Sequence, residues 1–341
     1  MYVLEYHYLR ERKMEKGLEF LFGRLERRNS VFAIESVALI YNALTTLIIF
    51  MLFNRLDNPG QMLYERCGIV LLTLSLMTVY KLRPCRFTAL IRVIAQMSLL
   101  AYWYPETYEF NSVLPNLDHW FAGADQLLFG CQPSLAFSSH YHYKFLSEAF
   151  NMGYFFYYPM IFMVVIYYFI KHFEYFEKVA FLLTASFFMY YIFYILVPVA
   201  GPQFYFPAIG MENVLDGNFL SIGDYFHHNR DLLPGPGYTD GFFYKLVESS
   251  QQVGERPTAA FPSSHVAIST IVMLLAFDAN RRLALFMFPF YVLLCCATVY
   301  IQAHYLIDSV MGFVTSFFVL RFVMFLYEKY FSVRRLYAVR A

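Results

Sequence analysis

Residues 263–308 read SSHVAISTIVMLLAFDANRRLALFMFPFYVLLCCATVYIQAHYLID. Two apolar runs, 264–279 and 283–302, are separated by a short polar turn, and each approaches the ~20 residues that a helix needs to cross a bilayer. At a rise of about 1.5 Å per residue, such a pair leaves one membrane border, turns and returns to it. The pattern therefore predicts that His265 and His304 lie at the same border, although 39 residues separate them in the sequence.

The composition of the whole chain is that of a polytopic membrane protein. Of its 341 residues, 59% are hydrophobic, 21% are aromatic and only 15% are charged. Soluble domains carry about 25% charged residues, so this composition excludes an ordinary soluble domain. The net charge of +1 carries no information about a partner. We expect no nucleic acid to bind.

Eight stretches are long and apolar enough, or nearly so, to form spanning helices. They are 31–54, 62–80, 87–104, 151–171, 178–198, 264–279, 283–302 and 306–327. We find no internal repeat and no low-complexity linker between them. The sequence therefore predicts an all-α polytopic membrane protein with about eight transmembrane helices.

The distribution of Lys and Arg predicts the orientation of these helices. With the N-terminus in the cytoplasm, the inner segments hold 18 basic residues and the outer segments hold six. The six outer ones are Arg55, Arg66, Lys144, Arg230, Lys245 and Arg256. We therefore expect both termini in the cytoplasm and the two histidines on the opposite side. The basic segment 1–30 could lie on the inner leaflet or form a solvated helix.

Two outer connections are long. Residues 105–150 include NLDHWFAGADQLLFGCQPS, which is too polar to span a bilayer and too apolar for a free loop. We expect this connection to lie along the interface or to dip back into the protein. Residues 199–263 are rich in Gly and Pro, which predicts an ordered cap or a gating loop.

His304 and Asp308 form the first half of a candidate reactive site. Their i, i+4 spacing predicts that both lie on one face of a helix, one turn apart. A carboxylate in that position accepts the imidazole N–H, fixes the tautomer and leaves the other ring nitrogen free to attack.

The second half lies at the start of the preceding apolar run. Ser263 and Ser264 would form the first turn of a helix, whose N–H groups and hydroxyls suit an anion such as phosphate. The same helix terminus makes protonated His265 a readier proton donor. Arg256 could supply a guanidinium to the same anion.

Several other features have an ordinary structural explanation beside a functional one. Glu35 and Arg92 fall inside apolar stretches, where a charge is functional unless it lies near a helix end or is paired. His140 and His142 could bind a metal or simply belong to an interfacial loop. We interpret the five cysteines as small hydrophobic residues. Because no carboxylate cluster suggests Mg²⁺ or Ca²⁺, we expect no metal and no other cofactor.

The order of these motifs resembles the type 2 phosphatidic acid phosphatase superfamily, whose signature is Lys-x6-Arg-Pro, Pro-Ser-Gly-His and Ser-Arg-x5-His-x3-Asp. Arg256-Pro257, Pro262-Ser263-Ser264-His265 and His304-x3-Asp308 match it in order. Within the superfamily, AAFPSSHVAIS and AHYLIDSVMG are most similar to the inositol phosphorylceramide synthase branch. The resemblance covers roughly residues 110–325.

The resemblance implies a six-helix phosphatase-like core with two extra N-terminal spans. It divides the chain into a basic cytoplasmic segment (1–30), N-terminal spans (31–104), a catalytic membrane domain (105–330) and a cytoplasmic tail (331–341). It also implies that His304 is the nucleophile, that Asp308 orients it and that His265 transfers protons. Ser263, Ser264 and Arg256 would then hold the phosphoryl oxygens.

The sequence departs from the signature at two of its cationic positions. Ser249 stands where the signature lysine is expected, and Lys245 is the nearest substitute. Thr298 stands where an arginine is expected, and Arg230, His227 or His228 could replace it. A phosphatase needs these cations to bind a phosphate monoester, whereas a transferase acts on a less highly charged diester.

These observations favour an enzyme that transfers a phosphoryl-headgroup from a phospholipid to a ceramide-like lipid hydroxyl through a phosphohistidine. The main alternative is a lipid phosphate phosphatase, with water as the acceptor. A third possibility is a haem-binding or non-catalytic membrane protein, in which His265 and His304 are ligands or packing residues. In the first two, the expected partners are membrane lipids. The sequence predicts no oligomeric state.

Overall fold

The computed structural model describes residues 15–25 and 31–332, so most of the basic segment 1–30 and of the tail 331–341 lies outside it. The described residues are helical and contain no strand, which confirms the predicted all-α fold class. The helices are α2 (Ala33–Leu52), α3 (Pro59–Leu82), α4 (Arg86–Ser98), α5 (Leu100–Asn111), α6 (Asp118–Phe129), α7 (Pro133–His140), α8 (Lys144–Phe155), α9 (Tyr157–Lys171), α10 (Phe173–Leu196), α11 (Pro202–Ile209), α12 (Met211–Leu215), α13 (Tyr225–His228), α14 (Phe242–Gly254), α15 (Ser264–Ala279), α16 (Arg281–Tyr300), α17 (Leu306–Tyr327) and the short π-helix η1 (Glu328–Ser332).

Each of the eight predicted stretches coincides with a helix or a pair of helices. In the described chain, six helices are long and apolar enough to cross a membrane: α2, α3, the continuous pair α4 and α5, α10, α16, and α17 with η1. Helices α8 and α9 form a further pair that is bent by 43°. Helix α15 is apolar but has only 16 residues. The chain is therefore an integral membrane protein with a bundle of antiparallel spans.

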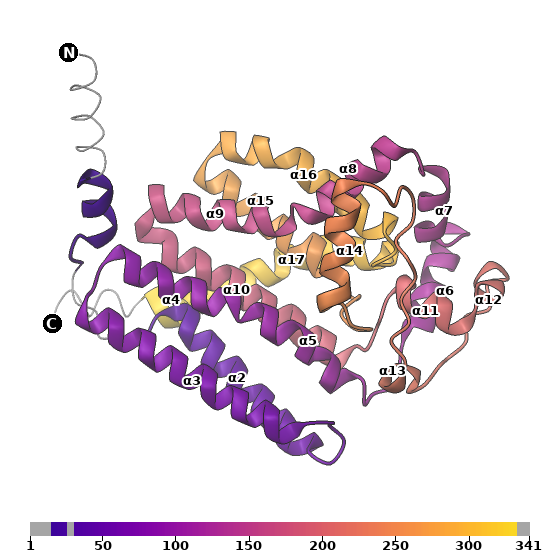
Figure 1. Cartoon of the computed structure of the whole chain (residues 1–341), viewed down its shortest axis with the longest axis horizontal. Coiled ribbons are helices and arrows are strands. Elements are labelled where there is room, and N and C mark those ends of the chain that lie inside the picture. Colours follow the sequence, from indigo (N-terminus) through magenta and orange to yellow (C-terminus); the bar gives the residue numbers. More distant parts are fainter. Residues whose placement is uncertain (1–14, 26–30, 333–341) are drawn as a thin grey trace.

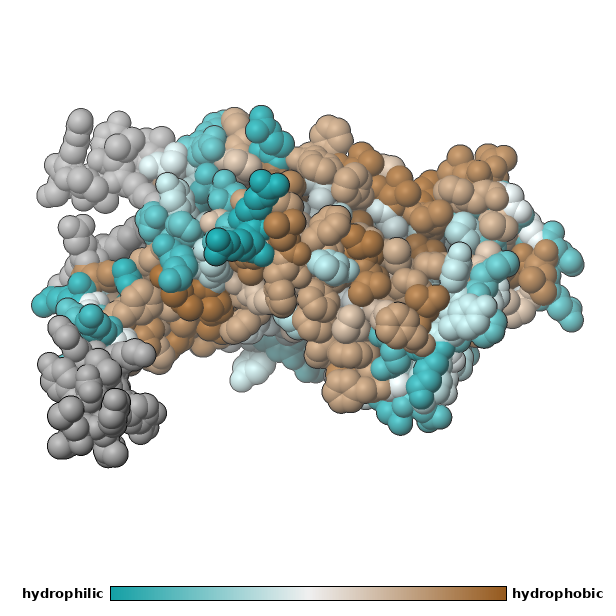
Figure 2. Space-filling view, turned by 90° about the horizontal axis from the view of Figure 1, so that it is seen from above, coloured by the Kyte–Doolittle hydropathy of each residue, from teal (hydrophilic) through white to brown (hydrophobic). Residues whose placement is uncertain are grey.

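The surface of the bundle is apolar where a bilayer would surround it. In the view of Figure 2, hydrophobic side chains cover the middle of the molecule and hydrophilic ones gather towards both ends. Large apolar side chains are exposed along the spans, among them Leu71 of α3 and Phe318 of α17. Exposed apolar side chains of this kind cost free energy in water but not in hydrocarbon.

Helix α10 lies at the centre of the bundle, and its side chains are buried around most of its circumference. It packs against α2, α5, α9, α15 and α17. Aromatic rings fill much of this core: Tyr41 of α2 stacks on Phe188 of α10 with ring centroids 4.2 Å apart. The aromatic composition of this region thus serves packing between helices.

Four charged residues of the N-terminal spans form two buried ion pairs. The guanidinium of Arg92 donates to both carboxylate oxygens of Glu35, at 2.5 and 2.6 Å, and both side chains are almost completely buried. Arg66 of α3, which was predicted to be an outer residue, is buried within the bundle and forms a similar pair with Glu106. A buried charge without a partner is costly, so these pairs have a structural explanation.

The two long connections fold into short helices at one end of the bundle. Residues 105–150 contain α6 and α7, and residues 199–263 contain α11, α12, α13 and α14. Figure 1 shows α6, α7, α11, α12 and α13 together at one end of the bundle, on the right of the view. We call this end, which includes the start of α15, the end of α16 and the start of α17, the histidine end. Both connections are ordered, as the sequence predicts for the second.

His140 and His142 are exposed at the histidine end. One ring nitrogen of each is hydrogen-bonded to a nearby backbone carbonyl, that of Ala136 at 3.1 Å and that of Ser139 at 2.7 Å. Within the described ranges, no group of three or more His, Cys, Asp or Glu side chains is arranged to hold a metal ion. The hydrogen bonds to Ala136 and Ser139 give both histidines a local contact at the end of α7.

Candidate active site

His265 and His304 meet at the histidine end, as the antiparallel pair of helices predicts. His265 is in the first turn of α15, and His304 lies in the loop between α16 and α17. The Nε2 atom of His304 is 3.4 Å from the Nδ1 atom of His265. The two rings are steeply inclined, with an interplanar angle of 65°. His304 is buried, whereas His265 is partly exposed.

The hydrogen-bond partner of His304 differs from the predicted one. Its Nδ1 atom lies 2.8 Å from the backbone carbonyl oxygen of Ala260, and 3.9 Å from the nearest carboxylate oxygen of Asp308. Helix α17 begins at Leu306, so His304 precedes the helix and the predicted i, i+4 pair on one helical face is not formed. A carbonyl oxygen can only accept, so Nδ1 carries the proton and Nε2 is left with its lone pair.

Burial controls the charge of His304. Removal from water lowers the pKa of its imidazole to about 4, and the hydrogen bond to Ala260 opposes that shift only in part. The ring is therefore neutral near pH 7. A neutral imidazole with an unprotonated Nε2 is the nucleophilic form of histidine.

Asp308 joins the start of α17 to the start of α15. Its Oδ2 atom accepts the backbone N–H of Tyr305 at 2.9 Å, in the arrangement of a capping box. Its backbone carbonyl accepts the N–H of Ser263 at 3.0 Å. The Oδ1 atom is buried and has no hydrogen-bond partner in the described part of the chain. The residue therefore has a structural role and one free acceptor next to His304.

Tyrosine side chains surround His265. The ring of Tyr154 stacks on it at a centroid distance of 4.7 Å, and that of Tyr157 lies 4.6 Å away. The hydroxyl of Tyr194 donates to the carbonyl of Pro262 and accepts the N–H of Ser264. The first turn of α15 is thus held from the side by aromatic residues of α8, α9 and α10.

The two serines have different partners. The hydroxyl oxygen of Ser263 accepts the N–H of Val266 at 3.4 Å and caps α15. The N–H of Ser264 is donated to the hydroxyl of Tyr194 at 3.0 Å, and the side chain of Ser264 is hydrogen-bonded to the same hydroxyl. Both serines therefore help to hold the first turn of α15.

Of the two cations predicted to bind phosphate, Arg256 lies near the start of α15 and Lys245 does not. Arg256 directly precedes the loop that leads to α15 and donates to the carbonyl of Glu255 at 2.8 Å. Lys245 lies on the exposed face of α14 with 63% of its side chain accessible, 3.9 Å from Asp240. The structure does not bring Lys245 into contact with the histidines. Lys245 was predicted to replace the signature lysine, but it lies four residues before that position, on an exposed helical face. Its side chain therefore points to solvent.

Arg230 is the other cation near Arg256. Its guanidinium lies over the ring of Tyr108 at 4.6 Å, and both arginines interact electrostatically with Glu109. Next to Arg256, the carboxylate of Glu255 accepts from Gln203 at 3.3 Å, and burial raises its pKa to about 7. The positive charges at this end are therefore partly balanced by nearby carboxylates.

Two backbone features permit the close approach of the two motif loops. A Cβ atom on Gly312 of α17 would collide with the backbone oxygen of Ser263, so only glycine lets α17 pack against the start of α15. Ala259 and Gln302 adopt positive φ angles of 69° and 64°, which are rare for residues with a side chain. Ala259 precedes the carbonyl that binds His304, so the strain coincides with the site.

Two carboxylates of α6, which are not among the predicted site residues, hold the segment that follows His304. Asp118 accepts the hydroxyl of Tyr305 at 2.9 Å, next to His304. Asp125 accepts the N–H groups of Leu306 and Ile307 at 2.8 and 3.0 Å. Burial raises the pKa of both carboxyls. Their i, i+7 spacing on a mostly apolar helix was the available signal, since such residues lie on one helical face.

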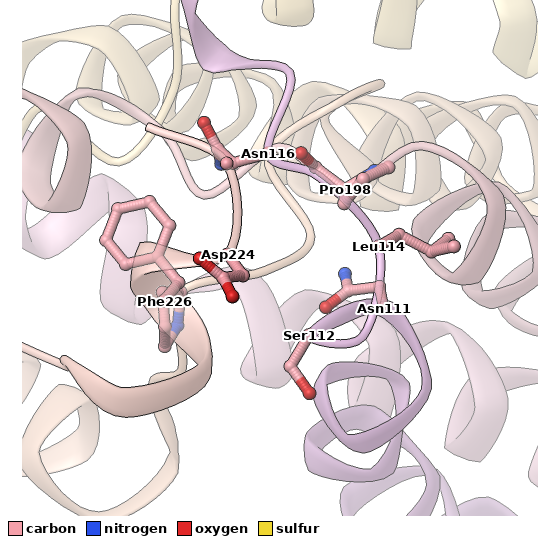
Figure 3. A pocket seen from close by; sticks show the side chains of 9 residues that line it. Asn111, Ser112, Leu114, Asn116, Pro198, Asp224 and Phe226 are labelled. Carbon is pink, nitrogen blue, oxygen red and sulfur yellow. Dashed lines mark hydrogen bonds between the residues drawn. The ribbon is translucent and has the colours of Figure 1, made fainter. Parts of the chain in front are cut away.

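A shallow pocket opens beside this site. It is lined by Asn111, Ser112, Leu114, Asn116, Pro198, Gly223, Asp224, Phe226 and Pro257. Figure 3 shows the carboxylate of Asp224 and the amide of Asn111 directed towards the same space. The amide of Asn111 also donates to the hydroxyl of Thr258, in the segment that follows Arg256. The pocket adjoins this segment but is not lined by the histidines.

Comparison with known families agrees with this geometry. A family profile described as the PAP2 superfamily matches residues 119–322. The chain belongs to the PAP2 superfamily. The matched range begins in α6, ends in α17 and includes His265 and His304. No curated protein and no solved structure matches the chain.

PAP2 superfamily membership supports an enzyme of the lipid phosphatase or phosphotransferase type. The spans formed by α2, by α3 and by the pair α4 and α5 all lie before the matched region of this PAP2 chain.

Proposed function

We propose that this protein transfers a phosphoryl-headgroup from a phospholipid to the hydroxyl of a ceramide-like lipid, with His304 as the nucleophile. The observation that carries the proposal is the pair of ring nitrogens 3.4 Å apart, one of which belongs to a buried, neutral imidazole. The Ala260 carbonyl orients this imidazole, so that its Nε2 lone pair faces His265. This is the arrangement that a nucleophile and a proton donor require.

The first half-reaction forms a covalent intermediate. Nε2 of His304 attacks phosphorus, and the bond between phosphorus and the diacylglycerol oxygen breaks. His265, which takes up a proton when the anionic phosphoryl group binds beside it, donates that proton to the oxygen. The phosphoryl group has to enter between the two rings, and His265 is the one of the two that is partly exposed. His304 bears a positive charge in the intermediate, and the free Oδ1 of Asp308 can turn towards it.

The second half-reaction releases the product. His265, now neutral, takes a proton from the acceptor hydroxyl, whose oxygen attacks phosphorus. The phosphorus–nitrogen bond breaks and His304 returns to its neutral form. Arg256 and the hydroxyl of Ser264 would hold the phosphoryl oxygens in both steps.

A lipid hydroxyl is favoured over water as the acceptor because few cations are present. Lys245 is exposed and paired with Asp240, and Thr298 replaces an expected arginine. A phosphodiester carries less charge than a phosphate monoester and needs fewer cations. The short helices at the histidine end and the tyrosines around His265 would help to keep water away from the intermediate. Inositol phosphate as the transferred group comes from the resemblance to the synthase branch.

Purified protein tests the proposal directly. It is supplied with phosphatidylinositol with and without ceramide, and separately with phosphatidic acid. We expect a new product that forms only when ceramide is present, and that is lost in His304→Ala. Release of free phosphate from phosphatidic acid, without a ceramide-dependent product, would identify a lipid phosphatase instead. An absorption spectrum with a Soret band would support the haem-binding alternative and overturn the proposal.

A further inference from the structure

Helix α6 has one face that holds the catalytic segment and another that no part of the described chain covers. It has 12 residues and lies at the histidine end, in contact with α11 and α17. At about 1.5 Å per residue its length is roughly 18 Å, which is too short to cross a bilayer. One face of the helix is buried and carries two aspartates, and the other is exposed and apolar.

The inner face of α6 contacts the segment that follows His304 and the segment that precedes Ser263. Asp118 and Asp125 hold the segment that follows His304, through Tyr305 and the first N–H groups of α17. Phe121 packs on Phe261, which precedes the serines of α15, with ring centroids 4.6 Å apart. A shift of α6 would therefore move both histidine-bearing segments.

The outer face of α6 is apolar and exposed. Trp120 is 69% accessible, Leu127 is 86% and Leu128 is 61%. The only charged side chains of the helix are the two aspartates, which are buried on the inner face. A helix that faces water carries polar or charged residues on its exposed side. Tryptophan next to leucine is instead typical of the border between lipid and water.

We propose that α6 lies in the bilayer interface at the histidine end, with Trp120, Leu127 and Leu128 in contact with lipid. The start of α17, which is the end of a membrane span, is hydrogen-bonded to Asp125, so α6 lies at the depth where that span leaves the hydrocarbon. The lipid surface thereby sets the position of the helix that holds both histidine loops. This inference rests on the embedding of the chain in a membrane and not on the proposed chemistry.

Tryptophan fluorescence tests the lipid contact without any activity assay. The chain has only two tryptophans, Trp120 and Trp103, and Trp103 is fully buried in the bundle core. Trp103→Phe leaves Trp120 as the only emitter, and Trp120→Phe is the matched control. In phosphatidylcholine vesicles with brominated acyl chains, we expect Trp120 to lose most of its emission and Trp103 to lose little. Aqueous iodide should quench neither.

Two results would overturn the lipid contact. Quenching of Trp120 by iodide but not by brominated lipid would place α6 in water. Protection from both quenchers would show that protein, such as a second copy of the chain, covers this face.

The link to the site has its own test. Leu127→Ser with Leu128→Ser should lower turnover in bilayers, and the loss should shrink in detergent micelles, which impose no flat surface. The matched control is Leu71→Ser with Leu72→Ser, on the exposed face of α3. Equal turnover of the two double variants in bilayers would contradict the link. A protein inactive in every form would refute the proposed function and leave the fluorescence result standing.

Discussion

The Nδ1 atom of His304 lies 2.8 Å from the carbonyl oxygen of Ala260, and this hydrogen bond orients the imidazole. A backbone carbonyl cannot titrate, so it fixes the tautomer at every pH at which the ring is neutral. The carboxylate of Asp308 is 3.9 Å away and is otherwise occupied at the start of α17. The carbonyl of Ala260 therefore orients the imidazole of His304, and the carboxylate of Asp308 is left to compensate the positive charge that His304 would carry in the intermediate.

This division predicts how Asp308 variants behave. Asp308→Asn keeps an oxygen for the N–H of Tyr305 but cannot compensate a positive charge, so kcat should fall roughly 10²-fold or more with little loss of stability. Asp308→Ala should also lose about 1 kcal/mol of stability with the cap. Turnover and thermal unfolding of both variants check this. If Asp308→Asn had the kcat of the unmodified protein, Asp308 would be only a capping residue.

Stability should fall in acid because of His304. Its folded-state pKa of about 4 lies below the unfolded value of about 6.5, so the unfolded chain binds more protons between these pH values. The neutral ring contributes fully to the free energy of unfolding above pH ~6.5. This contribution falls by at most ~3 kcal/mol as the pH is lowered towards ~4. His304→Asn keeps a donor for Ala260 but does not titrate. Unfolding measured from pH 7 to pH 4 should show a smaller loss in this variant; equal losses would contradict the prediction.

Gly312 should be essential for the site although it touches no substrate. In Gly312→Ala the new Cβ meets the backbone oxygen of Ser263, so the starts of α15 and α17 must separate. We expect a large loss of turnover and lower stability. Gly123→Ala in α6, where a Cβ meets nothing within 4 Å, is the control and should gain up to about 1 kcal/mol from helix propensity. Similar turnover in the two variants would show that the close contact is dispensable.

The buried pair of Glu35 and Arg92 should be structural. Glu35→Gln leaves the guanidinium buried without a counter-charge, which should cost about 3–5 kcal/mol. The fraction that still folds should have normal kcat, because the pair has no contact with the histidines. Unfolding and activity per folded molecule separate the two effects. A variant of normal stability and reduced kcat would reveal a functional role.

The excess of basic residues in the inner segments predicts which end faces the cytoplasm. After the native cysteines are replaced, a cysteine at position 240 should react with an impermeant maleimide in intact cells, and one at position 281 should not. Both positions are exposed, at opposite ends of the bundle, so access to the reagent decides the result. The opposite labelling pattern would place the histidine end in the cytoplasm.

The spans could be predicted because a bilayer requires about 20 apolar residues for each crossing and leaves few alternatives. The meeting of His265 and His304 followed from the same rule, since two adjacent antiparallel helices return to one border. The ion-pair partners of buried charged residues could not be predicted from the length and order of the apolar stretches. Arg66 counted as an outer residue, yet it pairs with Glu106, 40 positions away, inside the bundle.

By itself, the sequence determined the helices, the shared border of His265 and His304, and their order within the PAP2 signature. These depend on local composition and on spacing along the chain, which are independent of distant contacts. Only the tertiary structure decided that Ala260, and not Asp308, orients His304, and that Asp118 and Asp125 hold its loop. Such contacts join segments far apart in sequence, and their geometry depends on how the helices pack.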